Sequence, residues 1–236
     1  MRNSEHTSKQ FDAELEAVRV RVLQMGGLVE EQVKLAVEAL VSGDFELSNR
    51  VIENDRQVNG LEVAIDEDCS TIIARRQPTA GDLRMIMTVL KTITDLERIG
   101  DEAAKIARMA KLVNSSDRLQ QPRFNEIRRM AGIAAEMLHK SLDAFARLDL
   151  HTSVDVVRQD QHVDEEFRAI IRQLITFMME DPRTISASIE ILFIAKAIER
   201  IGDHSKNISE YVIYMVKGKD MRHVSVEEIE REVMGQ

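Results

Sequence analysis

The sequence predicts an all-α protein built from two tandem three-helix bundles related by internal duplication. Three observations support this fold class. The 236 residues include only 10 glycines, 3 prolines and 4% aromatic residues, so helix breakers and strong β-formers are both rare. Apolar residues recur at three- and four-residue steps over long stretches, which is typical of amphipathic helices. The pentapeptide Glu-Arg-Ile-Gly-Asp occurs at 97–101 and again at 199–203, which indicates a repeat.

The first half predicts three long helices. The first is expected at about 11–42, where apolar side chains fall on one face. The second is expected at about 45–77, because apolar residues recur there one heptad apart and a proline follows. The third begins near a Thr79 or Asp82 cap and runs to about Val113.

The second half repeats this pattern after a polar break at 114–122. A shift of 105 residues places Val51 on Val156, and a shift of 102 places Glu97 on Glu199. Helices are therefore expected at about 124–148, 150–180 and 184–217. The predicted domains are 8–116 and 121–217, followed by a charged tail at 218–236 that forms a short helix or a frayed end.

Charge and composition exclude several functional classes. The formal net charge of −9 repels phosphate backbones at long range and argues against direct nucleic-acid binding. The single Cys69 forms no intrachain disulfide and is expected to be a half-buried, inert thiol. No run approaches the roughly 18 apolar residues of a membrane span, and the opening residues lack a signal peptide's apolar segment. We therefore expect a cytoplasmic protein that reaches a membrane only through partners.

The repeated motif carries a pair of carboxylates in each half. Glu97 and Asp101, like Glu199 and Asp203, are four residues apart and so share one helix face. By the helical wheel each pair continues an apolar stripe, with Leu83 in the first half and Ile185 in the second, while Asp95 is expected on the opposite, solvent-facing side. Carboxylates on a core-directed stripe are partly desolvated, and no Lys or Arg lies on that line. A bound cation is therefore favoured.

The second helix of each half adds oxygen-bearing side chains at the same spacing of four. Glu62 and Asp66 extend the line only in the first half, so the repeat does not select them. Clustered carboxylates with a carboxamide suit Mg, Mn, Fe or Zn ions. The predicted metal ligands are Asp55, Asn59, Glu97 and Asp101 in the first half, and Asp160, Asp164, Glu199 and Asp203 in the second.

Two other interpretations of these acids remain open. The first is a carboxylate-bridged, metal-dependent enzyme, either a hydrolase or an oxidase. Di-iron bundles use two Glu-x-x-His pairs, however, and this chain has one, Glu136 with His139, which we expect to be an ordinary surface pair. There is also no Gly-rich phosphate loop and no motif for nucleophilic catalysis. The second alternative makes the acids purely structural, as helix caps and salt-bridge partners.

Four segments together resemble the PhoU family, the regulators of bacterial phosphate uptake. The loop-to-helix segment 75–84 is similar to a family signature, and the acidic segment 95–101 follows it at the right distance. The second acidic copy with Asn207-Ile208, and the closing stretch 216–223, are similar as well. The resemblance covers nearly the whole chain.

This resemblance implies a PhoU-like fold of six helices in two bundles, with metal clusters held by the E-x-x-x-D pairs. It also implies self-association as a homodimer or a higher oligomer. The implied role is a negative regulator of the phosphate regulon, with the sensor histidine kinase and the ATPase subunit of the phosphate ABC transporter as partners. One departure concerns the first half, where Lys105 replaces Asn207 and Glu102 replaces His204. A lysine near Glu97 would weaken cation binding there, which favours the second site.

Overall fold

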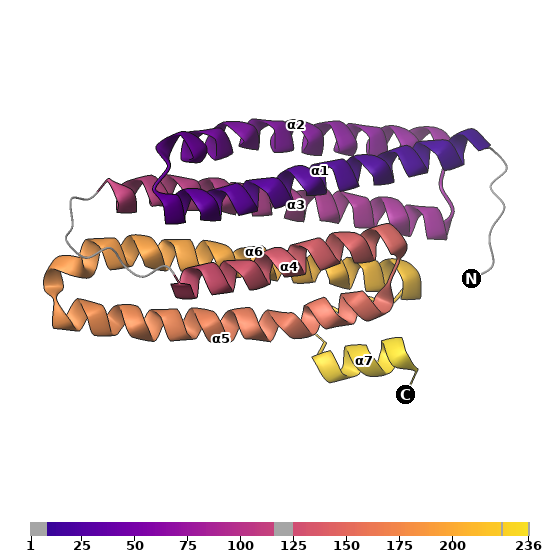
Figure 1. Cartoon of the computed structure of the whole chain (residues 1–236). Coiled ribbons are helices and arrows are strands. Elements are labelled where there is room, and N and C mark those ends of the chain that lie inside the picture. The colour runs from indigo at the N-terminus through magenta and orange to yellow at the C-terminus, as the bar shows by residue number, and fades with distance from the viewer. Residues whose placement is uncertain (1–8, 116–124, 223, 236) are drawn as a thin grey trace.

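The structure, a computed structural model, describes residues 9–115, 125–222 and 224–235. Within these residues six long α-helices form two three-helix bundles, and a seventh, short helix follows (Figure 1). The predicted all-α fold is confirmed. The helix bounds are α1 Lys9–Ser42, α2 Phe45–Arg76, α3 Ala80–Asn114, α4 Asn125–Arg147, α5 Leu150–Glu180, α6 Ile185–Lys217 and α7 Val226–Met234, with a 3₁₀ turn at Pro182–Thr184.

The helix ends agree with the predicted ends to within two residues, apart from the start predicted at Phe124. That residue, Pro122 and His223 lie outside the described residues. The second helix of each bundle begins at an aspartate cap. Asp44 accepts a hydrogen bond from the Leu47 N–H at 3.0 Å, and Asp149 accepts one from the His151 N–H at 2.9 Å. Equivalent caps at equivalent positions show that the duplication extends to local backbone chemistry.

The heptad residues that predicted α2 and α5 form the inner faces of the bundles. Val58 and Ile65 on α2, and Val163 and Ile170 on α5, are all buried. Their side chains belong to one hydrophobic core that includes residues of all six long helices. The narrow apolar seam read from the sequence is therefore a real packing surface.

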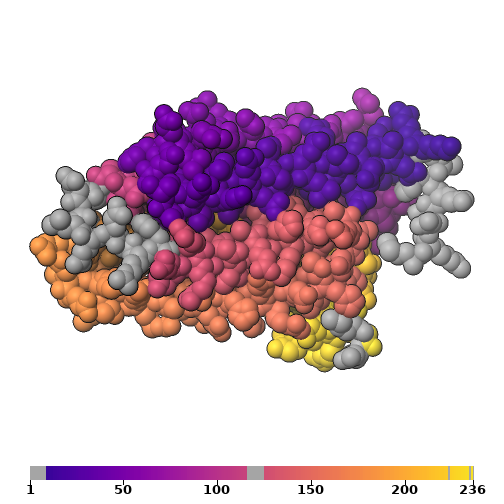
Figure 2. Space-filling model, in the orientation of Figure 1, coloured from indigo at the N-terminus to yellow at the C-terminus, as the bar shows by residue number. Residues whose placement is uncertain are grey.

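The two bundles lie side by side, and their broadest contact is between α3 and α6, which run antiparallel (Figure 1). The space-filling view shows the indigo first bundle in contact with the orange second bundle along their length (Figure 2). This packing corrects one prediction, because Leu83 is 39% exposed and Ile185 is 42% exposed. The stripe that carries the acids therefore follows the flank of the bundle and does not point into its core.

The tail forms the predicted short helix. Ile229 on α7 and Met221 before it are buried against Val154, Val157 and Ile213, which form a small second core. Lys219 also pairs with Glu232 at 2.7 Å. The tail is thus attached to the second bundle by packing. None of the described helices is both long enough and apolar enough to cross a membrane.

Candidate metal centre and the adjoining bundle interface

The glycine of each repeated motif allows two helices to approach closely. At Gly100 on α3, a Cβ would lie 3.2 Å from Gln32 Oε1 and 3.3 Å from Asp55 Oδ1. At Gly202 on α6 the nearest atom is Val163 Cγ1, at 3.4 Å. Both glycines therefore seat the second helix of their bundle against the third, but polar oxygens surround only the first. This contact places the acids of the two helices at the same level.

The first acid cluster comprises Asp55 and Asn59 on α2 with Glu97 and Asp101 on α3. Burial raises the pKa of the Asp55 carboxyl, hydrogen bonds from Gln32 and Asn59 lower it in part, and the charge of Asp101 raises it. Burial also raises the pKa of Glu97, and the charges of Asp101 and Asp55 contribute in the same direction. The structure therefore brings these predicted residues into one electrostatically coupled group.

Two residues that the sequence did not select also belong to this cluster. Burial raises the pKa of the Glu62 carboxyl, and the charge of Glu62 contributes to the raised pKa of Glu97. Gln32 on α1 is only 2% exposed, and its Nε2 donates to Val51 O at 3.2 Å and to Asp55 Oδ1 at 3.4 Å. Glu62 lies seven residues after Asp55 and so on the same side of α2, a signal that a search for repeated positions discards.

The cluster has more hydrogen-bond acceptors than donors. Gln32 Oε1 and Asn59 Oδ1 are buried without a hydrogen-bond partner. Their neighbours Asp55, Glu97 and Asp101 are carboxylates, which accept and do not donate when ionised. Arg98 is the cation that the structure places against Glu97, at 3.6 Å. An excess of buried oxygen acceptors is the condition that a bound cation relieves.

The second acid cluster is organised differently. Burial raises the pKa of Asp203 to about 6, and the charges of Glu199 and Asp160 add to this, although part of the Asp203 side chain is open to solvent. Lys206 Nζ, however, lies 2.8 Å from Asp160 Oδ2, and Lys196 Nζ contacts Glu199. No lysine lies on the predicted line in the sequence, but this did not predict that lysines beside the line would pair with the acids of the second half. Each lysine reaches its acid from a position to one side of the predicted line.

The remaining predicted ligand, Asp164, pairs with Arg168 on its own helix at 3.5 Å. Across the described ranges, no three His, Cys, Asp or Glu side chains lie close enough to hold a metal ion with their present rotamers. The residues of the first cluster nevertheless suit such an ion by their chemistry, because the orphaned oxygens of Gln32 and Asn59 adjoin the carboxylates.

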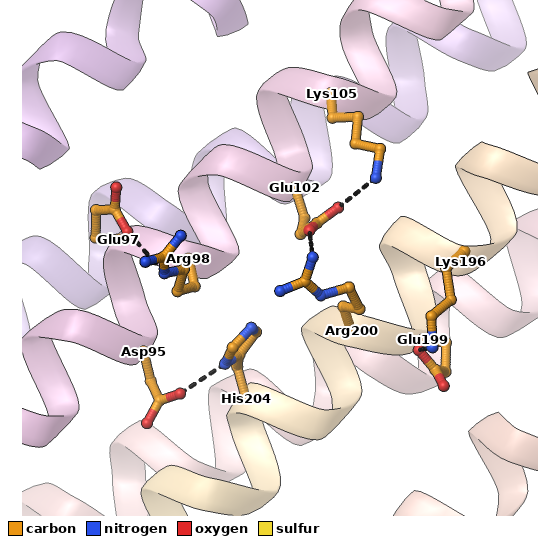
Figure 3. A network of polar contacts seen from close by, with 9 residues as sticks. All are labelled: Asp95, Glu97, Arg98, Glu102, Lys105, Lys196, Glu199, Arg200 and His204. Atoms are coloured by element: carbon orange, nitrogen blue, oxygen red, sulfur yellow. Dashed lines mark hydrogen bonds and ion pairs between the residues drawn. The ribbon is translucent and has the colours of Figure 1, made fainter.

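The opposite face of each motif helix forms the bundle interface, shown in Figure 3. Asp95 on α3 is only 7% exposed, and its Oδ1 lies 2.6 Å from His204 Nδ1 and 3.2 Å from Asn207 Nδ2 on α6. The prediction of a solvent-facing Asp95 is wrong, because α3 packs against its own bundle and also against α6. The side opposite the acid pair is therefore a second buried face.

A second ion pair crosses the same interface. Arg200 Nη1 lies 2.7 Å from Glu102 Oε1, and Lys105 Nζ lies 3.3 Å from the other oxygen of Glu102 (Figure 3). Lys105 therefore has a partner at the bundle interface. The two residues of the Glu-x-x-His motif have different partners, because Glu136 pairs with Lys140 and His139 pairs with Glu30.

Comparison with known proteins agrees with this geometry. The sequence matches the PhoU domain twice, over residues 22–110 and 127–212. It is 48% identical over 232 residues to the phosphate-specific transport system accessory protein PhoU of Escherichia coli (strain K12), covering 98% of this chain and 95% of that one. Both matched segments contain one copy of the acidic motif.

Two solved structures have the same fold. PhoU from Pseudomonas aeruginosa matches with a TM-score of 0.86 and 48% identity, covering 89% of this chain and all of that one. The phosphate transport system regulatory protein PhoU from Streptococcus pneumoniae matches with a TM-score of 0.82 and 28% identity, covering 89% of this chain and 98% of that one. On these matches and the paired acidic motifs, the chain belongs to the PhoU family.

Proposed function

We propose that this chain is a cytoplasmic, non-enzymatic negative regulator of phosphate uptake and of the phosphate regulon. It acts by contacts with the sensor histidine kinase of the regulon and with the ATPase subunit of the phosphate ABC transporter, and it self-associates as a homodimer or a larger oligomer. The observation that carries this proposal is the match along nearly the whole chain to relatives named as accessory proteins of phosphate-specific transport. A match over 98% of the chain includes both bundles.

The side chains of the described residues support a role in binding more than one in catalysis. Burial raises the pKa of the Cys69 thiol to about 12, so this cysteine stays protonated and is unsuited to act as a nucleophile. The polar face opposite the acid pairs is occupied by the Arg200–Glu102 ion pair and the His204–Asp95 hydrogen bond between the bundles.

We further propose that metal ions held at the duplicated acidic motif, of the Mg, Mn, Fe or Zn type, are structural or sensing elements of this regulator. The clustered carboxylates of α2 and α3 support this role, because a bound cation would offset their mutual repulsion. The metal supplies charge neutralisation. The chain's own residues orient the carboxylates, through the close approach at Gly100 and the hydrogen bonds of Gln32 to Asp55.

The test is a binding experiment with purified components. The full chain is immobilised and incubated separately with the cytoplasmic part of the kinase and with the transporter ATPase, in excess phosphate. Retention of either partner, and not of an unrelated histidine kinase or ATPase, is the expected result. Repeated failure to retain both would contradict the proposal. Steady-state turnover of phosphate esters that disappears in the Glu199→Gln/Asp203→Asn variant would instead support the metal-dependent hydrolase.

A further inference from the structure

We infer that the two repeats neutralise their acids in different ways. The first acid cluster binds a hard divalent cation of the Mg²⁺ or Mn²⁺ type. In the second repeat the ammonium groups of Lys196 and Lys206 neutralise the acids in place of a metal ion. This inference rests on the proposed metal-binding role of the duplicated motif and reverses the preference for the second site that the sequence suggested. Its basis is a comparison of equivalent positions.

The second repeat contains its own cations. Lys206 Nζ donates to Asp160 Oδ2 at 2.8 Å. Lys206 also lines one pocket together with Asp203 and Glu210. Its ammonium group therefore lies among the acids of α5 and α6. An ammonium hydrogen-bonded to one carboxylate and close to two others does the electrostatic work of a monovalent ion.

Lys196 supplies the second cation of this repeat. Its Nζ contacts Glu199 and also lies 5.6 Å from the centre of the Phe167 ring, within cation–π range. Phe167 occupies the position that Glu62 occupies in the first repeat, at the shift of 105 residues. The second repeat thus has an aromatic ring that contacts a lysine at the position where the first repeat has a carboxylate. These two differences act in the same direction, because both lower the local negative charge.

The first repeat lacks both lysines. At the shift of 102 residues, Lys196 corresponds to Thr94 and Lys206 to Ala104. The Thr94 hydroxyl donates to Leu90 O at 3.1 Å and carries no charge. The carboxylates of this cluster are those of Asp55, Glu62, Glu97 and Asp101. The cations near them are arginines of α3, because Arg98 lies beside Glu97 and is more than half exposed to solvent, and the charge of Arg108 acts on Asp55.

Two neutral oxygens point to a ligand independently of the carboxylates. Gln32 is 2% exposed, its amide nitrogen donates to Val51 O and Asp55, and its Oε1 has no hydrogen-bond partner. Oε1 and Asp55 Oδ1 both lie about one contact distance from the absent Cβ of Gly100, so they face the same small space between α1, α2 and α3. Asn59 Oδ1, also buried, is unpartnered as well.

The donor chemistry selects the class of ion. Carboxylate and amide oxygens without a thiol or an imidazole are the ligands of hard cations such as Mg²⁺ and Mn²⁺. Mg²⁺ commonly keeps several waters and binds one or two carboxylates directly, so three converging acids are not required beforehand. The like charges of this cluster repel one another, and Glu97 lies 3.6 Å from Arg98. A bound divalent ion would offset this repulsion and accept the orphaned oxygens.

The inference is tested with Mn²⁺ alone as the probe, on the full chain after removal of metal with a chelator. Free Mn²⁺ is measured by its electron paramagnetic resonance signal during titration. The Glu97→Gln/Asp101→Asn variant should bind Mn²⁺ at least tenfold more weakly than the wild type. The Glu199→Gln/Asp203→Asn variant should stay within about twofold of it. The Glu53→Gln/Glu67→Gln variant, at exposed acids of α2, controls for the same change in net charge.

A second test adds a lysine to the first repeat or removes the lysines from the second, and the two changes should shift Mn²⁺ binding in opposite directions. Thr94→Lys places an ammonium beside Glu97 and should weaken Mn²⁺ binding, as the equivalent Lys196 does in the second repeat. Lys196→Thr/Lys206→Met removes the internal cations and should create one additional Mn²⁺ site, with a rise in Tm on adding Mn²⁺. Thr94 is exposed, so its substitution leaves the core intact.

Equal losses in both acid-pair variants, a loss confined to the second pair, or no Mn²⁺ binding by the wild type would each overturn the inference. The same preparations are passed over the immobilised kinase and ATPase. Retention of these partners with symmetric metal binding would refute the inference and leave the proposed function standing. If Mn²⁺ binds at the first cluster but neither partner is retained, the inference would stand and the proposed function would be refuted.

Discussion

Gly100 and Gly202 hold the same place in the repeated motif but have different neighbours. Both glycines are visible in the repeated pentapeptide, but the sequence does not reveal their neighbours. The structure shows that polar oxygens of Gln32 and Asp55 lie next to Gly100, whereas Val163 lies next to Gly202. Replacing glycine by alanine inside a helix gains roughly 1 kcal/mol from propensity, if the new Cβ has room. The neighbouring atoms therefore decide whether each Gly→Ala substitution stabilises or destabilises the protein.

We predict that Gly202→Ala is neutral or stabilises the protein by up to about 1 kcal/mol, because its Cβ makes an ordinary contact with Val163. Gly100→Ala should be less stable than Gly202→Ala by 1 kcal/mol or more, as a rough estimate, because its Cβ crowds Gln32, Asp55 and Val58. Urea denaturation of the two variants measures this difference. Equal stabilities would contradict the close packing at Gly100.

Glu210 on α6 provides a prediction about pH. It is 6% exposed, and burial raises its pKa from the ordinary 4.5 to about 7. Between these values the folded chain keeps a proton that the unfolded chain releases, so the stability from this group is full below about pH 4.5 and is lost as pH rises through 7. The loss amounts to at most about 3 kcal/mol.

The Glu210→Gln variant should therefore lose less stability than the wild type between pH 5 and 8. Asp203, with a pKa of about 6, contributes in the same direction in both proteins, so the difference between them isolates Glu210. The free energy of unfolding is measured at each pH by urea denaturation. Parallel pH profiles for the two proteins would show that Glu210 ionises normally in the folded chain.

At the scale of the helix, the sequence predicted which side chains of α3 and α6 share a face, but not what packs against each face. The four-residue spacing of Glu97 and Asp101 placed both on one face, and the charge of Asp101 helps to raise the pKa of Glu97, as that placement requires. The helical wheel also gave the angle of Asp95, but an angle does not reveal what packs against that side. Long lysines are similarly ambiguous, since Lys206 reaches Asp160 on another helix. Residues that differ between the repeats, such as Glu62, were lost because only shared positions were selected.

The Asp95–His204 contact should contribute strongly to the packing of α3 on α6. Asp95→Ala removes a buried acceptor from both His204 and Asn207, and should destabilise the fold by about 3 kcal/mol. Asp143→Asn, which removes one charge of an exposed pair with Arg147, should cost less than about 0.5 kcal/mol. A double-mutant cycle with His204→Ala separates the coupling from other effects. A coupling energy near zero would show that the contact adds nothing.

At the scale of the whole molecule, the duplication predicted two units, and the structure joins them into one body. Each half has its own helix order, which the sequence showed, and its own capping aspartate, which the structure added. The hydrophobic core is nevertheless continuous through α3 and α6 and includes residues of both bundles. Sequence periodicity reports which residues of a helix are apolar, but it does not say which of two neighbouring bundles they face. The shared core of the two bundles is therefore seen only in the structure.

Because the core is shared, the two bundles should unfold together. If α3 and α6 separated first, each would expose residues that are now fully buried, among them Ile99 and Ile201, and would strand the charges of Glu102 and Arg200. Differential scanning calorimetry should show one transition whose calorimetric and van't Hoff enthalpies agree. Asp95→Ala should move this transition to a lower temperature without splitting it. Two resolved transitions in the wild type would mean that the repeats remain independent folding units despite their common core.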